Sequence, residues 1–251
     1  MEHNAEGRND LMSETTLVFI HGSGDSARCW SELIPLVRWA PERVVALDLP
    51  GHGARADEPL PAQPTISAYA GLVRATLDAR GIRRAIVVGH SLGGAIALRL
   101  ALDAPVLVEG FALVGSGARL RVLPALLEAA RTDPTGTGHQ LVRLGYAPNH
   151  QEMADAYFAS MPPVARDALA QDLTACDAFD VMAELDGVTQ RALVIVGSED
   201  RLTPPKYAQY SAEHLPRATL VVVPEAGHYV QREAPDAVAA ALNEWLSRQQ
   251  D

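Results

Sequence analysis

Cysteine, aromatic residues and long apolar runs are all scarce in this sequence. Only two of the 251 residues are cysteines, Cys29 and Cys176, which excludes a disulfide framework. Such low usage is typical of a reducing compartment, so we expect two buried thiols and a cytoplasmic location. No apolar run approaches the roughly 20 residues that a membrane-spanning helix needs. Aromatic residues make up 5% of the chain, which indicates a small or aliphatic pocket.

Positive charge is in the minority, because 31 Asp and Glu residues outnumber 21 Lys and Arg residues and the formal net charge is −10. This balance argues against nucleic acid and an anionic membrane as partners, and leaves a small molecule as the expected partner. Residues 1–15 are polar and acidic, without the basic start and apolar stretch of a signal peptide, so we expect a flexible N-terminal tail. For the assembly we expect a monomer or a homodimer.

Motifs for metals and nucleotide cofactors are also missing. The eight histidines include no His-x-His or His-x-x-x-His pair, and the two cysteines form no pair at zinc-binding spacing. No Gly-x-Gly-x-x-Gly follows an expected strand, as a dinucleotide-binding turn requires. We therefore expect chemistry that uses neither a metal ion nor a cofactor.

Six short apolar runs predict six strands. Their apolar residues are continuous rather than alternating, as in strands buried on both faces of a parallel sheet. The predicted strands are Leu17–Ile20, Val44–Leu47, Ala85–Val88, Phe111–Val114, Ala192–Val196 and Leu220–Val223. Helices are predicted over Ile66–Arg80, Gly94–Leu102 and Ala234–Ser247. This alternation predicts an α/β fold with a doubly wound, mostly parallel sheet of about six strands.

One interval between predicted strands is far longer than the others, the 74 residues from Gly117 to Gln190. A structureless loop of that length inside a compact domain is improbable. The interval contains apolar residues at helical spacing in Leu120–Ala130, Gln151–Ser160 and Val164–Ala175, with a Gly-, Thr- and Pro-rich break at Thr132–Gly138. We interpret residues 117–190 as a helical cap, or lid, inserted into a core domain formed by residues 16–116 and 191–251.

The strongest functional motif is Gly89-His90-Ser91-Leu92-Gly93-Gly94, between a predicted strand and a predicted helix. A sharp strand-to-helix turn strains the backbone of its central residue, and the glycines relieve the crowding around it. The hydroxyl of Ser91 would then protrude above the sheet edge, next to a helix N-terminus that favours developing negative charge. Ser91 is the candidate nucleophile; the alternative is a Gly-rich turn that merely packs a helix against a strand.

A second motif, His21-Gly22-Ser23-Gly24, directly follows the first predicted strand. Stabilising an oxyanion needs backbone N–H groups aimed at the carbonyl oxygen that gains charge. We assign this role to the N–H of Ser23, with Gly24 as the fallback, together with the N–H of Leu92. An ordinary strand-to-helix turn would carry the same residues, and His21 is expected to brace the loop.

The candidate base and acid follow the last two predicted strands. Three histidines come just after a predicted strand: His21, His90 and His228. We assign the role of the base to His228, because His90 lies in the serine turn and His21 lies in the loop assigned to the oxyanion. Glu199 and Asp200 both follow the strand before it and both qualify as the acid that orients His228. Asp48 and Asp57, near the second strand, are weaker alternatives.

From Thr16 to Ser247 the chain resembles the α/β-hydrolase superfamily. The resemblance rests on the motifs above, on Asp48-Leu49-Pro50-Gly51-His52-Gly53 and on the order serine, acid, histidine. It implies that Asp200 rather than Glu199 is the acid, and that the long insertion is the lid. Members commonly begin with two further antiparallel strands, for which the residues before Thr16 are too few and too polar. The sheet is therefore expected to be shortened at that edge.

The chemistry of these residues predicts a serine hydrolase that cleaves a small to medium carboxylic ester, or a lactone, through an acyl-enzyme. The resemblance also allows carbon–carbon bond hydrolysis, cofactor-free perhydrolysis or a slow-turnover ligand-sensing receptor. The residues considered for the substrate pocket are Gly24, Trp30, Ser116, Tyr146, Phe179 and Tyr229.

Overall fold

The computed structural model describes residues 14–248, and its six strands form one sheet. The strands are β1 (Thr16–Ile20), β2 (Val44–Leu47), β3 (Ala85–His90), β4 (Val108–Val114), β5 (Arg191–Gly197) and β6 (Ala218–Val223). Their order is β2-β1-β3-β4-β5-β6, and every neighbouring pair is parallel. The predicted fold class is confirmed, because each apolar run forms a strand and the described chain adds no strand at the leading edge.

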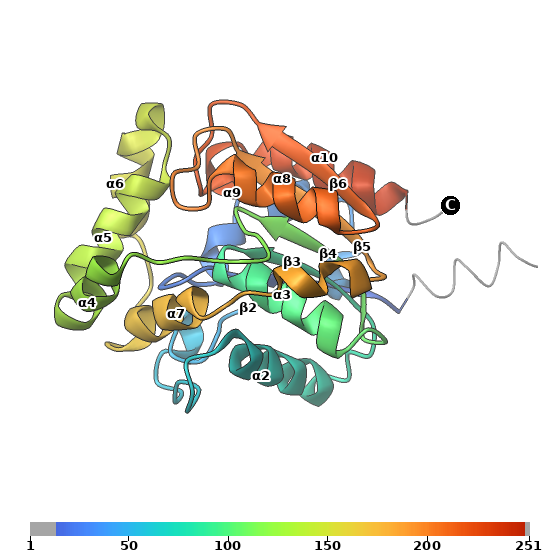
Figure 1. Ribbon diagram of the computed structural model, residues 1–251, viewed down its shortest axis with the longest axis horizontal. Helices are drawn as coiled ribbons and strands as arrows, with labels where there is room; N and C mark the ends of the chain where they lie inside the picture. Colours follow the sequence, from blue (N-terminus) through green and yellow to red (C-terminus); the bar gives the residue numbers. More distant parts are fainter. Residues whose placement is uncertain (1–13, 249–251) are drawn as a thin grey trace, which may run out of the picture.

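Helices cover both faces of the sheet, which explains why each strand contains a continuous apolar run (Figure 1). Val18 and Ile20 pack with α2 (Ile66–Ala79), α3 (Leu92–Asp103) and α8 (Pro205–His214). The alternate residues of β1 pack on the opposite face with α10 (Pro235–Ser247) and the short helix η1 (Ala27–Trp30). Two apolar layers thus hold the sheet rigidly from either side.

Local sequence signals set the helix bounds where they are clear. The hydroxyl of Thr65 caps α2 by accepting the N–H of Ala68 at 3.2 Å, and Gly81 follows the helix with φ +71°. The remaining short helices are η2 (Ile34–Leu36), η3 (Pro41–Arg43), η4 (Gly53–Arg55) and α9 (Val230–Glu233).

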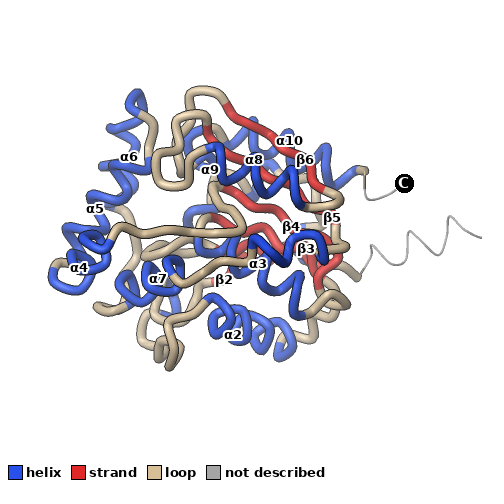
Figure 2. Tube along the Cα trace, viewed as in Figure 1, coloured by secondary structure: helices blue, strands red, loops and turns tan. Residues whose placement is uncertain are grey.

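Residues 117–190, called the insert below, contain α4 (Pro124–Thr132), α5 (Pro134–Gly145), η5 (Pro148–His150), α6 (Gln151–Ala159), α7 (Ala168–Asp177) and η6 (Met182–Gly187). Helices α4, α5 and α6 lie beyond the carboxyl ends of the strands, whereas the last residues, with Leu185 and Val188 in the core, pack on the sheet domain (Figures 1 and 2). The prediction of a break over Thr132–Gly138 is wrong for all of these residues except Asp133, because the others are helical. Asp133 alone separates two helices, because its carboxylate accepts the N–H of Gly136 at 2.9 Å and Pro134 suits the first turn of α5.

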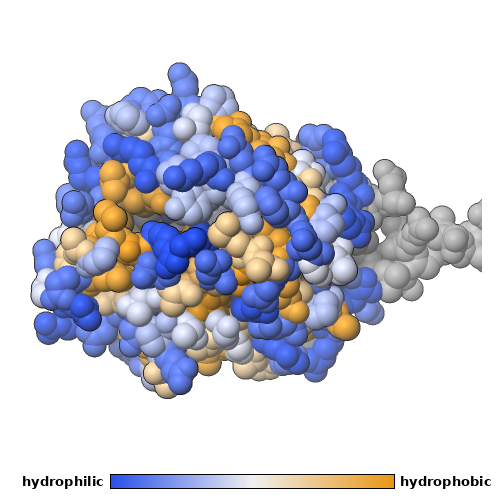
Figure 3. All heavy atoms as spheres, in the orientation of Figure 1, coloured by the Kyte–Doolittle hydropathy of each residue, from blue (hydrophilic) through white to orange (hydrophobic). Residues whose placement is uncertain are grey.

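Both cysteines are free and buried, as predicted. The predicted tail, residues 1–15, lies outside the described residues except for Glu14 and Thr15. None of the described helices is long and apolar enough to cross a membrane. On the face shown in Figure 3, hydrophobic residues gather over the insert, which carries the exposed side chains of Leu123, Leu144 and Met153.

Candidate active site

Ser91 occupies the turn between β3 and α3 in a strained backbone conformation, with φ 51° and ψ −114°. The turn is too tight for side chains beside it: a Cβ on Gly89 would lie 2.1 Å from the carbonyl oxygen of Gly93. A Cβ on Gly93 would lie 2.3 Å from the carbonyl oxygen of Ile20. Ser91 itself is half-buried and stays accessible, at the N-terminus of a helix.

His228 follows β6 and is 3% exposed, with its backbone N–H donating to the carbonyl of Gly145 at 2.6 Å. Its Nδ1 lies 2.9 Å from Oδ2 of Asp200 on the turn after β5. Because the carboxylate accepts, Nδ1 carries the proton and the other ring nitrogen, Nε2, keeps a lone pair. Glu199, the neighbouring acid, is exposed and its side chain has no hydrogen bond among the described residues.

The carboxylate of Asp200 is fully held in place. Its Oδ1 accepts the backbone N–H groups of Leu202 and Thr203 at 2.9 and 2.8 Å. The hydroxyl of Thr203 lies 2.8 Å from Oδ2 and 3.1 Å from Nδ1 of His228. Both carboxylate oxygens therefore accept hydrogen bonds, and the side chain presents a fixed acceptor to Nδ1 of His228.

The loop after β1 faces the same end of the sheet. The backbone N–H of Gly24 donates to Oδ2 of Asp172 on α7 at 2.9 Å, so it is already occupied. Among residues 14–248, the N–H groups of Ser23 and Leu92 have no hydrogen-bond acceptor. Of the two residues considered for the oxyanion loop, Ser23 is therefore the one whose N–H is free.

The two other histidines near the site are neutral and structural. Nε2 of His21 accepts the N–H of Leu49 at 3.0 Å, while Nδ1 donates to the carbonyl of Gly22, so His21 braces the loop as predicted. Burial and the nearby His52 lower the pKa of His21 to about 4. His90 donates from Nε2 to the carbonyl of His228 at 3.1 Å, and burial and His228 hold its pKa well below the usual value.

A cavity of about 210 Å³ brings Ser91 and His228 together. The core contributes Gly22, Ser23, His90, Ser91, Arg201, Leu202, Thr203, His228 and Tyr229 to its lining. The insert contributes Leu120, Arg121, Val122, Leu123, Leu126, Leu141, Leu144, Leu173 and Cys176. Most of the wall supplied by the insert is aliphatic, and the guanidinium groups of Arg121 and Arg201 add positive charge. The sequence reasoning missed these leucines, because the same residues also form an ordinary apolar helix face.

Several residues that were considered for the pocket lie behind its wall. Trp30 is fully buried against Phe19, with ring centroids 5.2 Å apart, and Phe179 belongs to the core. Ser116 donates to the backbone carbonyl of Ser91 at 2.8 Å and so supports the turn from beneath. Tyr146 is buried and stacks on Tyr229 with centroids 5.0 Å apart. Of the six, Tyr229 lines the cavity that holds Ser91.

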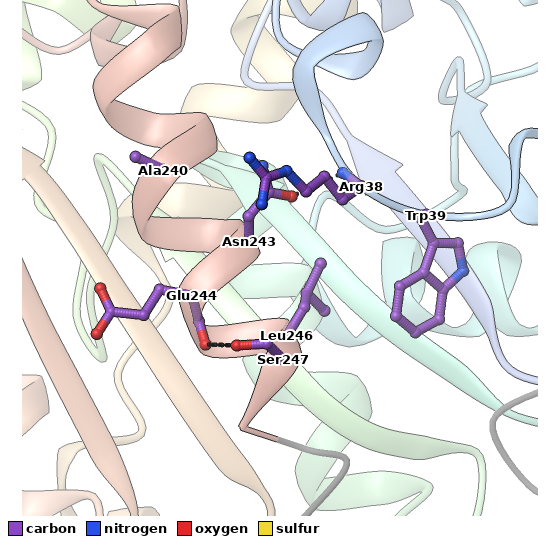
Figure 4. Close-up of a pocket in the computed structure, with 7 residues that line it drawn as sticks. All are labelled: Arg38, Trp39, Ala240, Asn243, Glu244, Leu246 and Ser247. Carbon is purple, nitrogen blue, oxygen red and sulfur yellow. Dashed lines mark hydrogen bonds between the residues drawn. The ribbon is translucent and has the colours of Figure 1, made fainter. Parts of the chain in front are cut away.

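Gly24 lines a second cavity of about 380 Å³, which shares Ser23, Leu141 and Tyr229 with the first. Another cavity, of about 470 Å³, lies away from the site between the Arg38–Trp39 segment and α10 (Figure 4). In it the hydroxyl of Ser247 donates to the backbone carbonyl of Glu244, and its described lining contains no histidine.

The sequence analysis also missed a buried polar cluster behind the loop that follows β1. Asp172 is fully buried on α7, with His52 and Tyr69 as further partners. Asp25 is 1% exposed and its Oδ1 accepts the hydroxyl of Tyr157 at 2.5 Å. Burial raises the pKa of Asp25 to about 6, against the lowering effect of that hydrogen bond. No group of three or more His, Cys, Asp or Glu side chains within residues 14–248 could hold a metal ion.

Known proteins share both the sequence pattern and this architecture. A model of the Alpha/beta hydrolase family matches residues 17–241. The chain belongs to the alpha/beta hydrolase family. It is 32% identical over 243 residues to a pimeloyl-(acyl-carrier protein) methyl ester esterase of Neisseria meningitidis serogroup C, covering 90% of this chain and 91% of that protein.

Solved structures of this family are also similar. A thermophilic esterase is 33% identical with a TM-score of 0.76, covering 93% of this chain and 90% of its own. Est816, described as an N-acyl homoserine lactone degrading enzyme, is 28% identical with a TM-score of 0.78, covering 93% and 92%.

Proposed function

We propose that this protein is a serine hydrolase that cleaves a carboxylic ester of a small to medium substrate. One observation carries the proposal: Ser91, on a strained turn, lines the same cavity as His228, whose Nδ1 is bound to the buried Asp200 at 2.9 Å. This arrangement leaves Nε2 of His228 as the base that faces the cavity. Related proteins that are named as esterases support the class of reaction.

In the proposed mechanism, Nε2 of His228 takes the proton of Ser91 as its oxygen attacks the ester carbonyl. The charged Asp200 stabilises the imidazolium that forms. The free N–H groups of Ser23 and Leu92 bind the oxyanion. His228 then protonates the leaving alcohol, and a water molecule activated by the same nitrogen releases the acid from Ser91.

The lining favours an apolar acyl or alcohol group. The insert contributes leucine and valine side chains above Ser91, so we propose that it acts as the cap of this site. Two neighbouring cavities that share the lining residues Ser23 and Tyr229 suit the two halves of an ester, one on either side of the scissile bond. A lactone fits the same chemistry, and the similarity to a lactone-degrading enzyme supports including it.

Labelling with a fluorophosphonate tests the proposal. We expect one adduct, on Ser91, and loss of p-nitrophenyl butyrate hydrolysis in Ser91→Ala with an unchanged melting temperature. Ser247→Ala is the matched control, because its hydroxyl is bound to the backbone carbonyl of Glu244 in the cavity that lies away from the site. An adduct on another serine, or wild-type turnover in Ser91→Ala, would refute the proposal.

A further inference from the structure

The oxyanion loop is tied to the insert through one buried carboxylate. Asp172 on α7 has no exposed surface, and its Oδ2 accepts the backbone N–H of Gly24 at 2.9 Å. The same oxygen lies 2.9 Å from Nε2 of His52, and Oδ1 accepts the hydroxyl of Tyr69 at 2.5 Å. Three donors from three separate parts of the core thus converge on a side chain of the insert.

The contact between α7 and the loop is wider than this hydrogen bond. Sγ of Cys176 lies 3.7 Å from the hydroxyl of Ser23. A Cβ on Gly24, which has φ +63°, would lie 3.0 Å from the side chain of Leu169. Leu169, Asp172 and Cys176 are three and four residues apart, so one face of α7 packs against the loop.

The contacts of both ring nitrogens of His52 favour its protonated form. Its Nδ1 lies 3.0 Å from the carbonyl oxygen of Pro50, and its Nε2 lies 2.9 Å from the carboxylate. Both partners are acceptors, and a neutral imidazole has a single N–H, so two such bonds require the imidazolium. The fully buried pair is therefore an ion pair.

The groups around His52 act on its pKa in both directions. Burial lowers the pKa, but the charge and hydrogen bond of Asp172, the carbonyl of Pro50 and the charge of Asp25 raise it above the usual value. His21, whose ring centroid is 5.0 Å away, has a strongly lowered pKa and stays neutral. Tyr69 also stays neutral, because burial and Asp172 raise its pKa. Together, the groups around His52 favour its protonated form.

We propose that Asp172 is a positioning residue for the reaction, held by protonated His52 and Tyr69, that orients the oxyanion loop through the N–H of Gly24. This rests on the proposed function, in which the preceding N–H, that of Ser23, binds the oxyanion. Fixing the Ser23–Gly24 peptide toward α7 keeps the Ser23 N–H available on the cavity side. The insert then determines the geometry of the transition-state contact as well as covering the substrate.

The first test separates positioning from folding. In Asp172→Asn the amide cannot serve all three donors, so we expect kcat for p-nitrophenyl butyrate to fall on the order of 10- to 100-fold, the range for a hydrogen bond to a charged group. We expect KM to change less than about threefold, because the oxyanion forms only in the transition state. Affinity for a trifluoromethyl ketone, which forms an oxyanion on Ser91, should fall in parallel with kcat/KM. Asp167→Asn is the matched control, because Asp167 is an exposed acid at the N-terminal cap of the same helix, without a side-chain hydrogen bond among the described residues.

The second test is the pH profile of kcat. As the pH rises through the raised pKa of His52, the ion pair is lost, so wild-type kcat should decline on the alkaline side. His52→Gln has no such titration, so its kcat should be lower at neutral pH and lack that decline. The wild-type value at high pH should approach the value of this variant.

The outcomes distinguish this inference from the proposed function. If Ser91→Ala is inactive but folded Asp172→Asn keeps wild-type kcat, the positioning role is refuted and the proposed function stands. Should Asp172→Asn fail to fold, Tyr69→Phe removes one donor and leaves the ion pair, and we expect a roughly three- to tenfold lower kcat at unchanged KM. Wild-type kcat in Tyr69→Phe would then refute the inference. Wild-type turnover in Ser91→Ala would refute the proposed function itself.

Discussion

Glu199 and Asp200 are adjacent acids on one turn, but their surroundings differ. Asp200 is buried and bound to His228, whereas Glu199 is exposed. An amide at position 200 keeps the shape but favours the wrong tautomer of His228, so Asp200→Asn should lower ester turnover on the order of 10³- to 10⁴-fold. Glu199→Gln is the matched control and should stay within about threefold of wild type. Steady-state turnover of both variants decides which of the two acids orients His228. A large loss in Glu199→Gln with near-normal turnover in Asp200→Asn would assign the acid to Glu199.

The contribution of Asp25 to the free energy of unfolding depends on pH. Its pKa is about 6 in the folded protein against 3.8 normally, so the folded state holds the proton more tightly. Stability from this group is complete below about pH 4 and is lost as the pH rises through about 6. Two pH units correspond to about 3 kcal/mol in the free energy of unfolding. Relative to Asp25→Asn, the wild type should therefore lose about that much between pH 4 and pH 7 in urea denaturation. An equal difference at both pH values would contradict the shift.

At the level of elements, the turn from β3 to α3 depends on glycines that let the helix approach β1. A methyl group at position 93 would lie 2.3 Å from the carbonyl oxygen of Ile20, so Gly93→Ala must push α3 away. We expect a loss of about 1–3 kcal/mol in the free energy of unfolding and a large loss of turnover, because Ser91 and Leu92 move with the helix.

Gly71→Ala is the control for this prediction. Gly71 lies in the middle of α2, and an added Cβ there meets nothing within 4 Å. Alanine in an exposed helix interior should raise the free energy of unfolding by about 0.5–1 kcal/mol without changing turnover. Thermal unfolding and ester assays measure both effects. Equal stability and turnover in Gly93→Ala and wild type would show that the turn tolerates the shift.

The elements that sequence could predict are those whose burial leaves a local pattern. Strands in the middle of a sheet that is covered on both faces need runs of apolar residues, and even the less buried β2 and β6 contain such a run, so all six could be located from their composition. The start of α5 could not, because Asp133 and Pro134 suit a loop as well as a helix N-terminus. Only packing between α4 and α5 decides between the two.

The candidate site likewise contains some residues that the sequence could predict and others that it could not. Ser91, His228 and Asp200 lie on turns whose glycines and strand context are visible in the sequence. Asp172 carries no such signal, because its partners Gly24, His52 and Tyr69 lie more than 100 residues away along the chain. Aromatic residues close to the motifs, such as Trp30, misled the pocket prediction, since large side chains there fill the core.

In the whole molecule, the core domain and the insert meet at the cavity that holds Ser91. The sheet holds Ser91, His228 and Asp200 close together, because each follows a parallel strand at the same edge. The insert is joined to this edge by hydrogen bonds such as Ala165 N–H to the carbonyl of Gly51, at 2.8 Å. In the proposed function, core residues carry out the chemistry, while the insert supplies most of the aliphatic wall.

This division predicts that preference for acyl chain length can be changed from the insert alone. Leu144 on α5 lines the cavity and is 39% exposed, so Leu144→Ala enlarges the site without removing a fully buried side chain. A methylene that fills a hydrophobic pocket changes kcat/KM by roughly 10-fold or more. We therefore expect the ratio of kcat/KM for p-nitrophenyl octanoate over the butanoate to rise about tenfold.

Val106→Ala is the matched control for Leu144→Ala, because Val106 is 89% exposed and does not line the cavity. It should leave the octanoate-to-butanoate ratio unchanged. The rate of fluorophosphonate labelling at Ser91 should be the same in both variants, since neither an aliphatic leucine nor a valine side chain can hydrogen-bond to His228 or Asp200. A shifted ratio with slowed labelling in Leu144→Ala would mean that α5 acts on the catalytic residues, for instance through the bond from His228 N–H to the carbonyl of Gly145. An unchanged ratio would place the acyl chain outside this cavity.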